Sequence, residues 1–308
     1  MFIVSGEALF DVFATGNTPT GIGFDGRIGG SPFNVALGLA RMGQAVGFFG
    51  GVGNGFAGER LMQALKEEGI DSRCTVRSDA PTTLSLIGLN AAGVPSYAFY
   101  GHGAADRQVT ADDLARIPPE AKAFHFGSYA MVVEPVAGAQ RALVQREHQR
   151  SVIAYDPNIR ANVEPNLEIW RATLQWMLPR THLLKVSDED LALLYPGQSI
   201  DDFAAKALAA GTPWVVVTRG GEGAVAYTAT SRVETAPVKV AVVDTVGAGD
   251  TFQASLLTWL AETNRLSPAA IAALTPEAQA EGLAFAARAA AITCSRRGAD
   301  LPRRAELG

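Results

Sequence analysis

Short apolar runs alternate with amphipathic helical patterns along most of this 308-residue chain, and this alternation constrains the fold more than any other feature. The apolar runs predict strands at residues 2–4, 45–49, 123–126, 152–155, 183–185 and 214–218, with helices between them. Strands joined through helices are parallel, and a parallel sheet is covered on both faces. The sequence therefore predicts an α/β fold with a mainly parallel central sheet.

Two segments, near residues 11–27 and 84–106, do not follow this alternation. Residues 83–89 and 97–100 alternate around an Ala-Ala-Gly turn, a pattern typical of a β-hairpin. No linker or internal repeat divides the chain. We therefore expect a single domain over residues 1–308, with a small β appendage near the strand ends, where sites gather in such folds.

Composition excludes several classes of protein. Apolar residues make up 48% of the chain, which is enough for a core and excludes general disorder. The net charge of −5 argues against nucleic-acid binding, which needs a basic excess. The uncharged stretch at 80–105 contains Pro, Gly and Asn, so it predicts strands and turns rather than a membrane span. Two separated cysteines and an N-terminus unlike a signal peptide predict a reduced, cytoplasmic protein.

Among the 32 glycines, three clusters stand out, at residues 29–30, 50–58 and 247–249. Each cluster either forms tight turns or cradles an anion with backbone N–H groups. Residues 53–58 match the Gly-x-Gly-x-x-Gly pattern between a strand and a helix, which keeps a dinucleotide-dependent oxidoreductase open as an alternative. A Walker P-loop is excluded, because none of the five lysines follows a glycine.

The third cluster lies within residues 244–250, Asp-Thr-Val-Gly-Ala-Gly-Asp. It follows an apolar, strand-like run at 238–243 and begins a predicted helix. Such a turn exposes free N–H donors, and the helix dipole strengthens their attraction for an anion. Asp250 is then either a helix cap or a base that takes a proton from an attacking hydroxyl while the turn holds a phosphoryl group.

This segment resembles the carboxyl-terminal signature of the ribokinase-like, or PfkB, carbohydrate kinases. Residues 29–36, Gly-Gly-Ser-Pro-Phe-Asn-Val-Ala, resemble the amino-terminal signature of the same family. Residues 6–11, Gly-Glu-Ala-Leu-Phe-Asp, and 155–160, Tyr-Asp-Pro-Asn-Ile-Arg, are similar to the fructokinase branch, although the 2-keto-3-deoxygluconate kinases share several such stretches. The resemblance covers the whole chain and implies a three-layer α/β/α fold with a small β-sheet lid.

The resemblance also implies an activity: ATP-dependent phosphorylation of the 6-hydroxyl of D-fructose, with Mg²⁺ and with K⁺ as a further candidate. Asp250 would be the base, Gly247, Ala248 and Gly249 the anion hole, and Arg160 would lie near the phosphoryl path. The implied sugar contacts are Asp11, Gly29, Gly30, Asn34 and His102. The implied nucleotide contacts are Lys185, Ser187, Thr218, Gly220, Gly223 and Thr245. Asp190 would reach the metal through water, and Asp244 would border a monovalent-cation site.

The sequence departs from the family pattern at three places. Ser187 and Asp190 stand where the family often has Asn-x-x-Glu, and Ala287 stands where many members have Asn. Gly101 replaces the arginine of several sugar-acid kinases, which weakens the 2-keto-3-deoxygluconate alternative. A catalytically silent sugar- or nucleotide-binding regulator is the alternative of another class. Apolar lid faces predict a homodimer, with no nucleic acid or membrane as partner.

Overall fold

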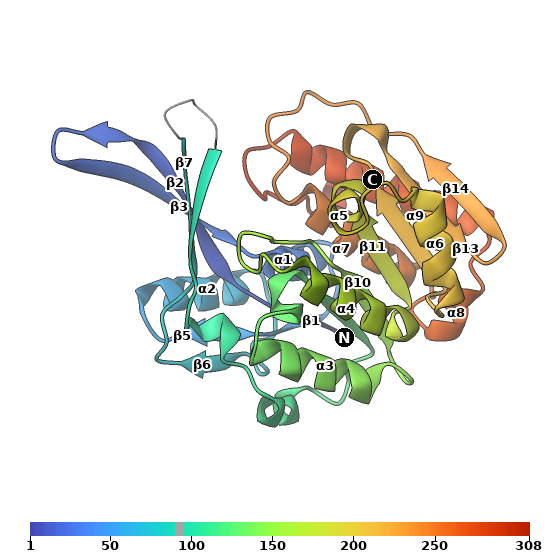
Figure 1. Cartoon of the computed structure of the whole chain (residues 1–308), viewed down its shortest axis with the longest axis horizontal. Helices are drawn as coiled ribbons and strands as arrows, with labels where there is room; N and C mark the ends of the chain where they lie inside the picture. The colour runs from blue at the N-terminus through green and yellow to red at the C-terminus, as the bar shows by residue number, and fades with distance from the viewer. Residues whose placement is uncertain (90–94) are drawn as a thin grey trace.

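The centre of the molecule is an eight-stranded sheet in the order β14-β13-β12-β11-β10-β9-β1-β4 (Figure 1). The computed structural model describes residues 1–89 and 95–308. Neighbouring strands from β4 to β12 pair in parallel, whereas β13 and β14 are antiparallel. The strands are β1 (Phe2–Ser5), β4 (Val46–Phe49), β9 (Ala123–Gly127), β10 (Val152–Asp156), β11 (Leu183–Ser187), β12 (Trp214–Thr218), β13 (Ala224–Thr228) and β14 (Ser231–Thr235). The expected mainly parallel sheet is confirmed.

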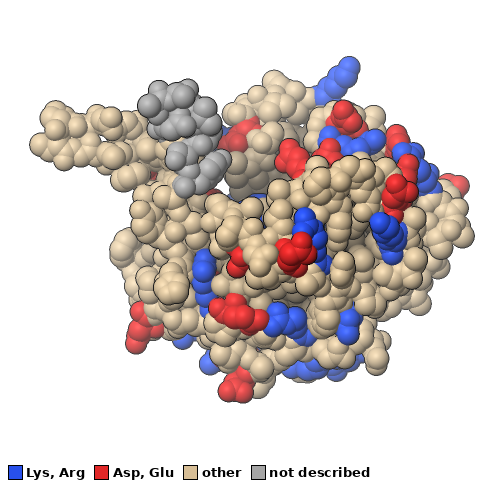
Figure 2. Space-filling view, in the orientation of Figure 1, with Lys and Arg blue, Asp and Glu red and all other residues tan. Residues whose placement is uncertain are grey.

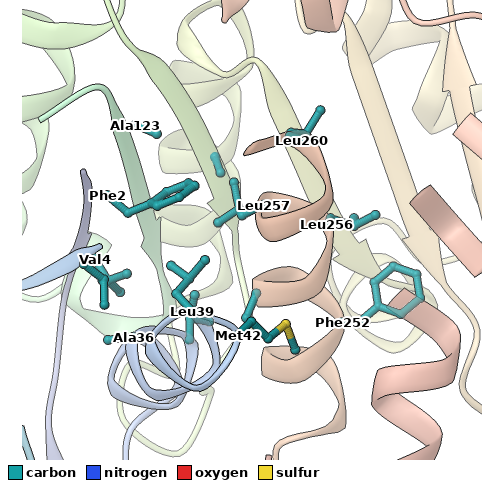
Figure 3. Close-up of a cluster of buried hydrophobic side chains, with 14 of the residues drawn as sticks. Phe2, Val4, Ala36, Leu39, Met42, Ala123, Phe252, Leu256, Leu257 and Leu260 are labelled. Atoms are coloured by element: carbon teal, nitrogen blue, oxygen red, sulfur yellow. The ribbon is translucent and has the colours of Figure 1, made fainter. Parts of the chain in front are cut away.

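Helices cover both faces of this sheet, and the expected three-layer α/β/α arrangement is confirmed. One face carries α1 (Ser31–Arg41), α2 (Phe56–Glu67), α7 (Ala248–Glu262), α8 (Pro268–Ala272) and α9 (Pro276–Cys294). The other carries α3 (Val136–Glu147), α4 (Leu167–Met177), α5 (Asp188–Leu194) and α6 (Ile200–Ala209). Figure 3 shows Phe2 of β1, Leu39 of α1 and Leu257 of α7 in the first of these two cores.

One expected element is wrong. Residues 238–243 form no strand but an extended loop, in which Val242 and Val243 are largely exposed. The antiparallel strand β14 already forms that edge of the sheet, and the loop bonds elsewhere: the N–H of Val243 donates to Cys294 O at 2.8 Å. An apolar run by itself therefore did not make a strand here.

A second, four-stranded sheet projects from the body in the order β3-β2-β7-β8 (Figure 1). Its strands are β2 (Leu9–Thr18), β3 (Gly21–Gly29), β7 (Leu84–Leu89) and β8 (Pro95–Tyr100), and we call it the small sheet. It contains the expected hairpin, because β7 and β8 pair antiparallel, although the Ala-Ala-Gly turn at 91–93 lies outside the described residues. Beside its base, β5 (Gly51–Gly53) pairs with β6 (Val76–Ser78).

Charged side chains are distributed unevenly between these two parts. Figure 2 shows acidic and basic groups interspersed over the body, whereas the projecting small sheet carries few charges on this face. Among the described residues, no helix is long and apolar enough to span a membrane.

Candidate active site

The parallel strands of the main sheet end at one edge, and polar residues lie at or just beyond the ends of five of them. Glu7 follows β1, Ser128 follows β9, Arg160 follows β10, Asp190 lies just beyond β11 and Thr218 ends β12. In open α/β sheets, ligands bind at the carboxyl ends of the strands. The residues expected to bind nucleotide and sugar therefore come from separate loops that meet along this edge.

The helices α1 and α7 bring the two signature segments together. Gly38 of α1 lies so close to α7 that an added Cβ would be 2.7 Å from the Cβ of Ala254. One turn earlier on each helix, Asn34 Nδ2 donates to Asp250 Oδ2 at 2.8 Å. The absent side chain at position 38 thus allows the close packing that places the start of α1 against the start of α7.

Asp250 is held by side chains from α1 and not by its own helix. Its Oδ1 accepts from Ser31 Oγ at 2.6 Å, and its Oδ2 accepts from Asn34. The cap position of α7 is Gly247, which has no side chain to bond, so the alternative that Asp250 is only a helix cap is wrong. Burial raises the pKa of Asp250, while the bonds from Ser31 and Asn34 and the charges of Lys185 and Arg160 limit the rise.

The turn before Asp250 has free N–H donors, as expected of a helix N-terminus. Within the described residues, no acceptor is bonded to the N–H groups of Gly249 and Asp250, whereas the N–H of Ala248 donates to Thr245 O at 3.2 Å. Gly247 adopts a φ of 79°, a left-handed conformation that favours glycine. This arrangement suits an anion held by backbone groups.

Of the residues expected to contact the sugar, four lie where the small sheet meets α1: Asp11, Gly29, Gly30 and Asn34. Asp11 of β2 fills the space where Gly29 of β3 has no side chain, its Oδ2 being 2.3 Å from an ideal Cβ there. Burial raises the pKa of Asp11, and the charge of Asp250 acts on it in the same direction. Gly30 connects β3 to α1, and His102 is exposed on the turn after β8.

Ser187, expected to contact the nucleotide, and Asp190 and Asp244, expected near metal ions, hold loops in place. Ser187 caps α5, accepting from the N–H of Asp190 at 3.0 Å, and Asp190 Oδ1 accepts from the N–H of Ile159 at 3.0 Å. Both Asp244 oxygens accept backbone N–H groups, from Val246 at 3.1 Å and from Gly298 at 2.8 Å.

The other expected nucleotide-side residues lie at strand ends and turns. Thr218 ends β12, Gly220 begins the turn Gly220–Glu222, and Gly223 follows it, packed against Thr235 O. Thr245 lies in the loop before α7. Arg160 is exposed and donates to Ile159 O at 3.0 Å. Lys185 differs from the rest, because it is buried and paired with Asp156.

Comparison with known proteins identifies this arrangement. The family described as pfkB family carbohydrate kinase matches residues 3–305. The chain belongs to this family. The curated fructokinase of Rhizobium leguminosarum bv. trifolii is 36% identical over 92% of this chain and 86% of the relative.

Solved kinase structures agree with the family assignment. A fructokinase from Xylella fastidiosa with bound ATP has a TM-score of 0.90 at 27% identity, over 99% of this chain and 96% of the other. A fructokinase from Vibrio cholerae O395, bound to fructose, ADP and calcium ion, has a TM-score of 0.83 at 27% identity, over 99% of this chain and 97% of the other. This pfkB-family chain is therefore an ATP-dependent sugar phosphotransferase.

Family membership overturns the dinucleotide alternative. Gly53 ends β5, outside the main sheet, and Gly58 lies in α2. An added Cβ on Gly58 would be 1.8 Å from Gly53 O, so these glycines let a helix pack against a strand. The match to Gly-x-Gly-x-x-Gly therefore reflects close packing in this pfkB-family kinase.

Three buried polar residues of this kinase were not among the expected site residues. Ser31 bonds Asp250, Asp156 bonds Lys185, and Glu7 lies where β1 passes into β2. Ser31 and Asp156 stand inside segments that carry the family resemblance, so their place in the signature was the available signal. Their partners depend on helix packing and strand register, which a sequence does not display.

Proposed function

We propose that this pfkB-family kinase transfers the γ-phosphoryl group of ATP to the 6-hydroxyl of D-fructose. The observation that carries the proposal is the buried Asp250, which lies beside free N–H donors at the start of α7 and is held by Ser31 and Asn34. The fructokinase names of its relatives support fructose as the substrate. Loss of an arginine at Gly101 disfavours a sugar acid.

In this mechanism Asp250 removes the proton of the sugar hydroxyl as its oxygen attacks the γ-phosphorus. One P–O bond forms to the sugar, the bond to ADP breaks, and the proton stays on Asp250. A carboxyl group whose pKa is raised by burial is suited to accept that proton. The N–H groups at the start of α7 hold the negative charge on the transferring group, which is the main contribution a protein makes to phosphoryl transfer.

The remaining contacts divide between two sides. Asp11, Gly29, Gly30, Asn34 and His102 hold the sugar on one side. Ser187, Thr218, Gly220, Gly223 and Thr245 border the nucleotide on the other. Arg160 lies near the phosphoryl path, since its charge lowers the pKa of Asp250 and of Asp11. The small sheet acts as a lid over the sugar and as the interface of a homodimer.

Mg²⁺ fits a site with few protein ligands. This ion commonly binds through one or two carboxylates, substrate phosphates and water. Asp190 offers an oxygen for this, because the structure records a bond to Oδ1 only. When bound, Mg²⁺ neutralises charge on the phosphates. At Asp244 both oxygens already accept N–H groups, so a K⁺ site there would draw on neighbouring carbonyl groups.

The test is a panel of sugars with ATP and Mg²⁺, followed by ADP release, and location of the new phosphate by ³¹P NMR. We expect D-fructose to give the highest kcat/KM and fructose 6-phosphate as product. Asp250→Asn should lower kcat about 10³-fold, while the exposed control Asp112→Asn should not change it. A kcat of Asp250→Asn within tenfold of the unaltered protein would refute the base assignment.

Other outcomes separate the alternatives. Preference for 2-keto-3-deoxygluconate would reassign the substrate and leave the mechanism standing. Binding of sugar and ATP without turnover of any sugar would favour the catalytically silent regulator.

A further inference from the structure

Gly249 is the second residue of α7, and a side chain at this position would crowd its neighbour. An added Cβ would lie 3.0 Å from Lys185 Nζ, nearer than ordinary van der Waals contact. Its neighbour Gly247 is different, since there the backbone conformation itself favours glycine. The missing side chain at position 249 therefore accommodates an ammonium group directly against the first turn of α7.

This ammonium group is half of a buried ion pair. Lys185 of β11 and Asp156 of β10 follow the paired residues Leu184 and Tyr155, so the parallel register sets them side by side. Lys185 Nζ lies 2.7 Å from Asp156 Oδ2, with the two side chains 6% and 2% exposed. Within the described residues, Asp156 is the one acceptor recorded for Nζ, which leaves two of its protons free.

Burying such a pair does little for stability by itself. The cost of removing both charges from water roughly cancels their attraction, and apolar replacements of equal volume are often as stable. The position of the pair therefore calls for another explanation, and its position is beneath the anion hole of a phosphoryl-transfer site.

The charges that surround the pair keep the lysine ionised. Burial alone would lower the pKa of Lys185, but Asp156, Asp190 and Asp250 outweigh it and raise the pKa. His125 of β9 is neutral, because burial and then Lys185 lower its pKa to about 3. Asp250 faces the cations Lys185 and Arg160, and it faces the carboxyl groups of Asp11 and Asp156.

We propose that Asp156 and Lys185 are positioning residues for the transfer: Asp156 fixes the Lys185 ammonium group beneath the first turn of α7, where its charge strengthens the anion hole and keeps Asp250 ionised. The inference deepens the proposed function and rests on it for the reaction itself. In this proposal the charge of Lys185 acts on the anion hole from beneath the first turn of α7, instead of contacting the nucleotide directly as the resemblance implies. A fixed charge of this kind needs no rearrangement as the phosphoryl group moves.

The first test replaces the charge and keeps the volume. Lys185→Met should lower kcat about 100-fold or more, with KM for ATP and sugar within about threefold, because the charge acts on the transition state. The acidic limb of the kcat profile should move up by about one pH unit or more, since Asp250 loses a neighbouring cation. The control Lys206→Met removes an exposed lysine of α6 and should change neither quantity.

The second test separates this role from a structural one. Lys185→Met and Asp156→Leu should each lower Tm, because each leaves one charge buried and unpaired. The double variant should recover most of the lost Tm without recovering kcat. Asp156→Asn, which keeps an acceptor oxygen for Nζ, should retain more kcat than Asp156→Leu. If kcat returns together with Tm in the double variant, the proposal is overturned.

A third measurement does not depend on the substrate. The titration of Asp250, assigned by ¹³C NMR of its carboxyl carbon against Asp250→Asn, should show a higher pKa in Lys185→Met than in the unaltered protein. An unchanged Asp250 titration would overturn the inference even if fructose is phosphorylated. If no sugar is phosphorylated but the titration moves, the proposed function fails and the electrostatic role of the pair stands.

Discussion

The two sheets of this kinase are built in opposite ways. In the main sheet the strands β1, β4, β9 and β10 are buried along their whole length, with helices on both faces. In the small sheet, residues 14–22 of β2 and β3 are exposed, and Ile22 and Phe24 keep 56% and 51% of their surface accessible. The main sheet is closed on both sides, whereas the small sheet leaves an apolar face open.

Because of this difference, the residues around Asp250 are held rigidly in the body, whereas part of the expected sugar site lies on the more exposed small sheet. Asp250, Ser31, Asn34 and Lys185 lie on helices and strands packed into the main body, where small displacements would misplace the proposed base. Asp11, in contrast, is carried by the small sheet. Changes in the body should therefore act on kcat, and changes in the small sheet should act on sugar binding and self-association.

Among the changes that test the contrast between the two sheets, the largest effect on turnover is expected where α1 meets α7. Gly38→Ala inserts a Cβ 2.7 Å from Ala254 Cβ, which should separate the helices and draw Ser31 and Asn34 away from Asp250. We expect unfolding to require about 1–3 kcal/mol less free energy and kcat to fall at least about tenfold. Urea unfolding and steady-state kinetics measure the two.

Its matched control is the helix glycine Gly138 of α3. There the nearest atom to an added Cβ is the flexible carboxyl end of Glu134, at 3.2 Å. Gly138→Ala should therefore raise stability by up to about 1 kcal/mol and leave kcat unchanged. Equal effects of the two substitutions on kcat would contradict the role of helix packing in placing Asp250.

The next largest effect, on self-association and on the sugar KM, should come from the open face of the small sheet. We expect Ile22→Ser combined with Phe24→Ser to convert a homodimer into monomers, because apolar faces of this kind are covered by partners. The sugar KM should rise about tenfold while kcat changes little, since the lid would lose support. Sedimentation and kinetics give the readout, and a chain already monomeric at micromolar concentration would refute the predicted dimer.

The body provides the control for that variant. Phe56 at the start of α2 is 93% exposed, so Phe56→Ser also removes an exposed aromatic ring. It should alter neither sedimentation nor KM. If it dissociates the protein as well, the interface lies on the body and not on the small sheet.

A smaller effect on the sugar KM is expected where the small sheet joins the body. Asp106 is buried and accepts from Thr83 Oγ1, just before β7, at 2.5 Å and from Tyr129 of the body at 2.9 Å. Asp106→Asn replaces one acceptor oxygen by an amide that faces a donor, at a cost of about 1–3 kcal/mol in stability. The sugar KM should rise a few-fold, with kcat nearly unchanged.

Asp113→Asn tests whether that KM effect is specific. Asp113 likewise accepts from Thr110, in a 3₁₀ turn away from the small sheet. Asp113→Asn should therefore lower stability without changing the sugar KM. A KM effect that follows stability in both variants would argue against Asp106 as an anchor of the small sheet.

The contrast between the sheets also explains how far the sequence could predict the molecule. The six buried parallel strands appear as apolar runs, so these strands and helices such as Leu167–Met177 were predicted closely, whereas the antiparallel strands β13 and β14 were not predicted. The run at 238–243 was misassigned, because an apolar run becomes a strand only where its backbone pairs with a neighbouring strand, and among the described residues this run pairs with none. Asp250 was found through its signature, whereas the pair of Asp156 and Lys185 depends on the register of two strands far apart in sequence.

The smallest effect on turnover should come from Glu7, where the main sheet passes into the small one. Burial raises its pKa to about 8, so the folded chain keeps a proton that the unfolded chain loses near pH 4.5. The unfolded state therefore binds fewer protons between these values, and stability falls as pH rises, by up to about 1.4 kcal/mol per pH unit. Glu7→Gln is neutral throughout, so its free energy of unfolding should change less between pH 5 and 8, as urea unfolding would measure.

Turnover at pH 7 should change little in Glu7→Gln, because the amide resembles the protonated carboxyl that the folded protein already holds there. Glu120 is the control: Arg73 holds its pKa below the ordinary value, so its charge state changes only below about pH 4.5. Glu120→Gln should leave the slope between pH 5 and 8 as it is. If Glu7→Gln keeps that slope too, the buried carboxyl between the sheets is ionised, and the junction is more accessible to water than its burial implies.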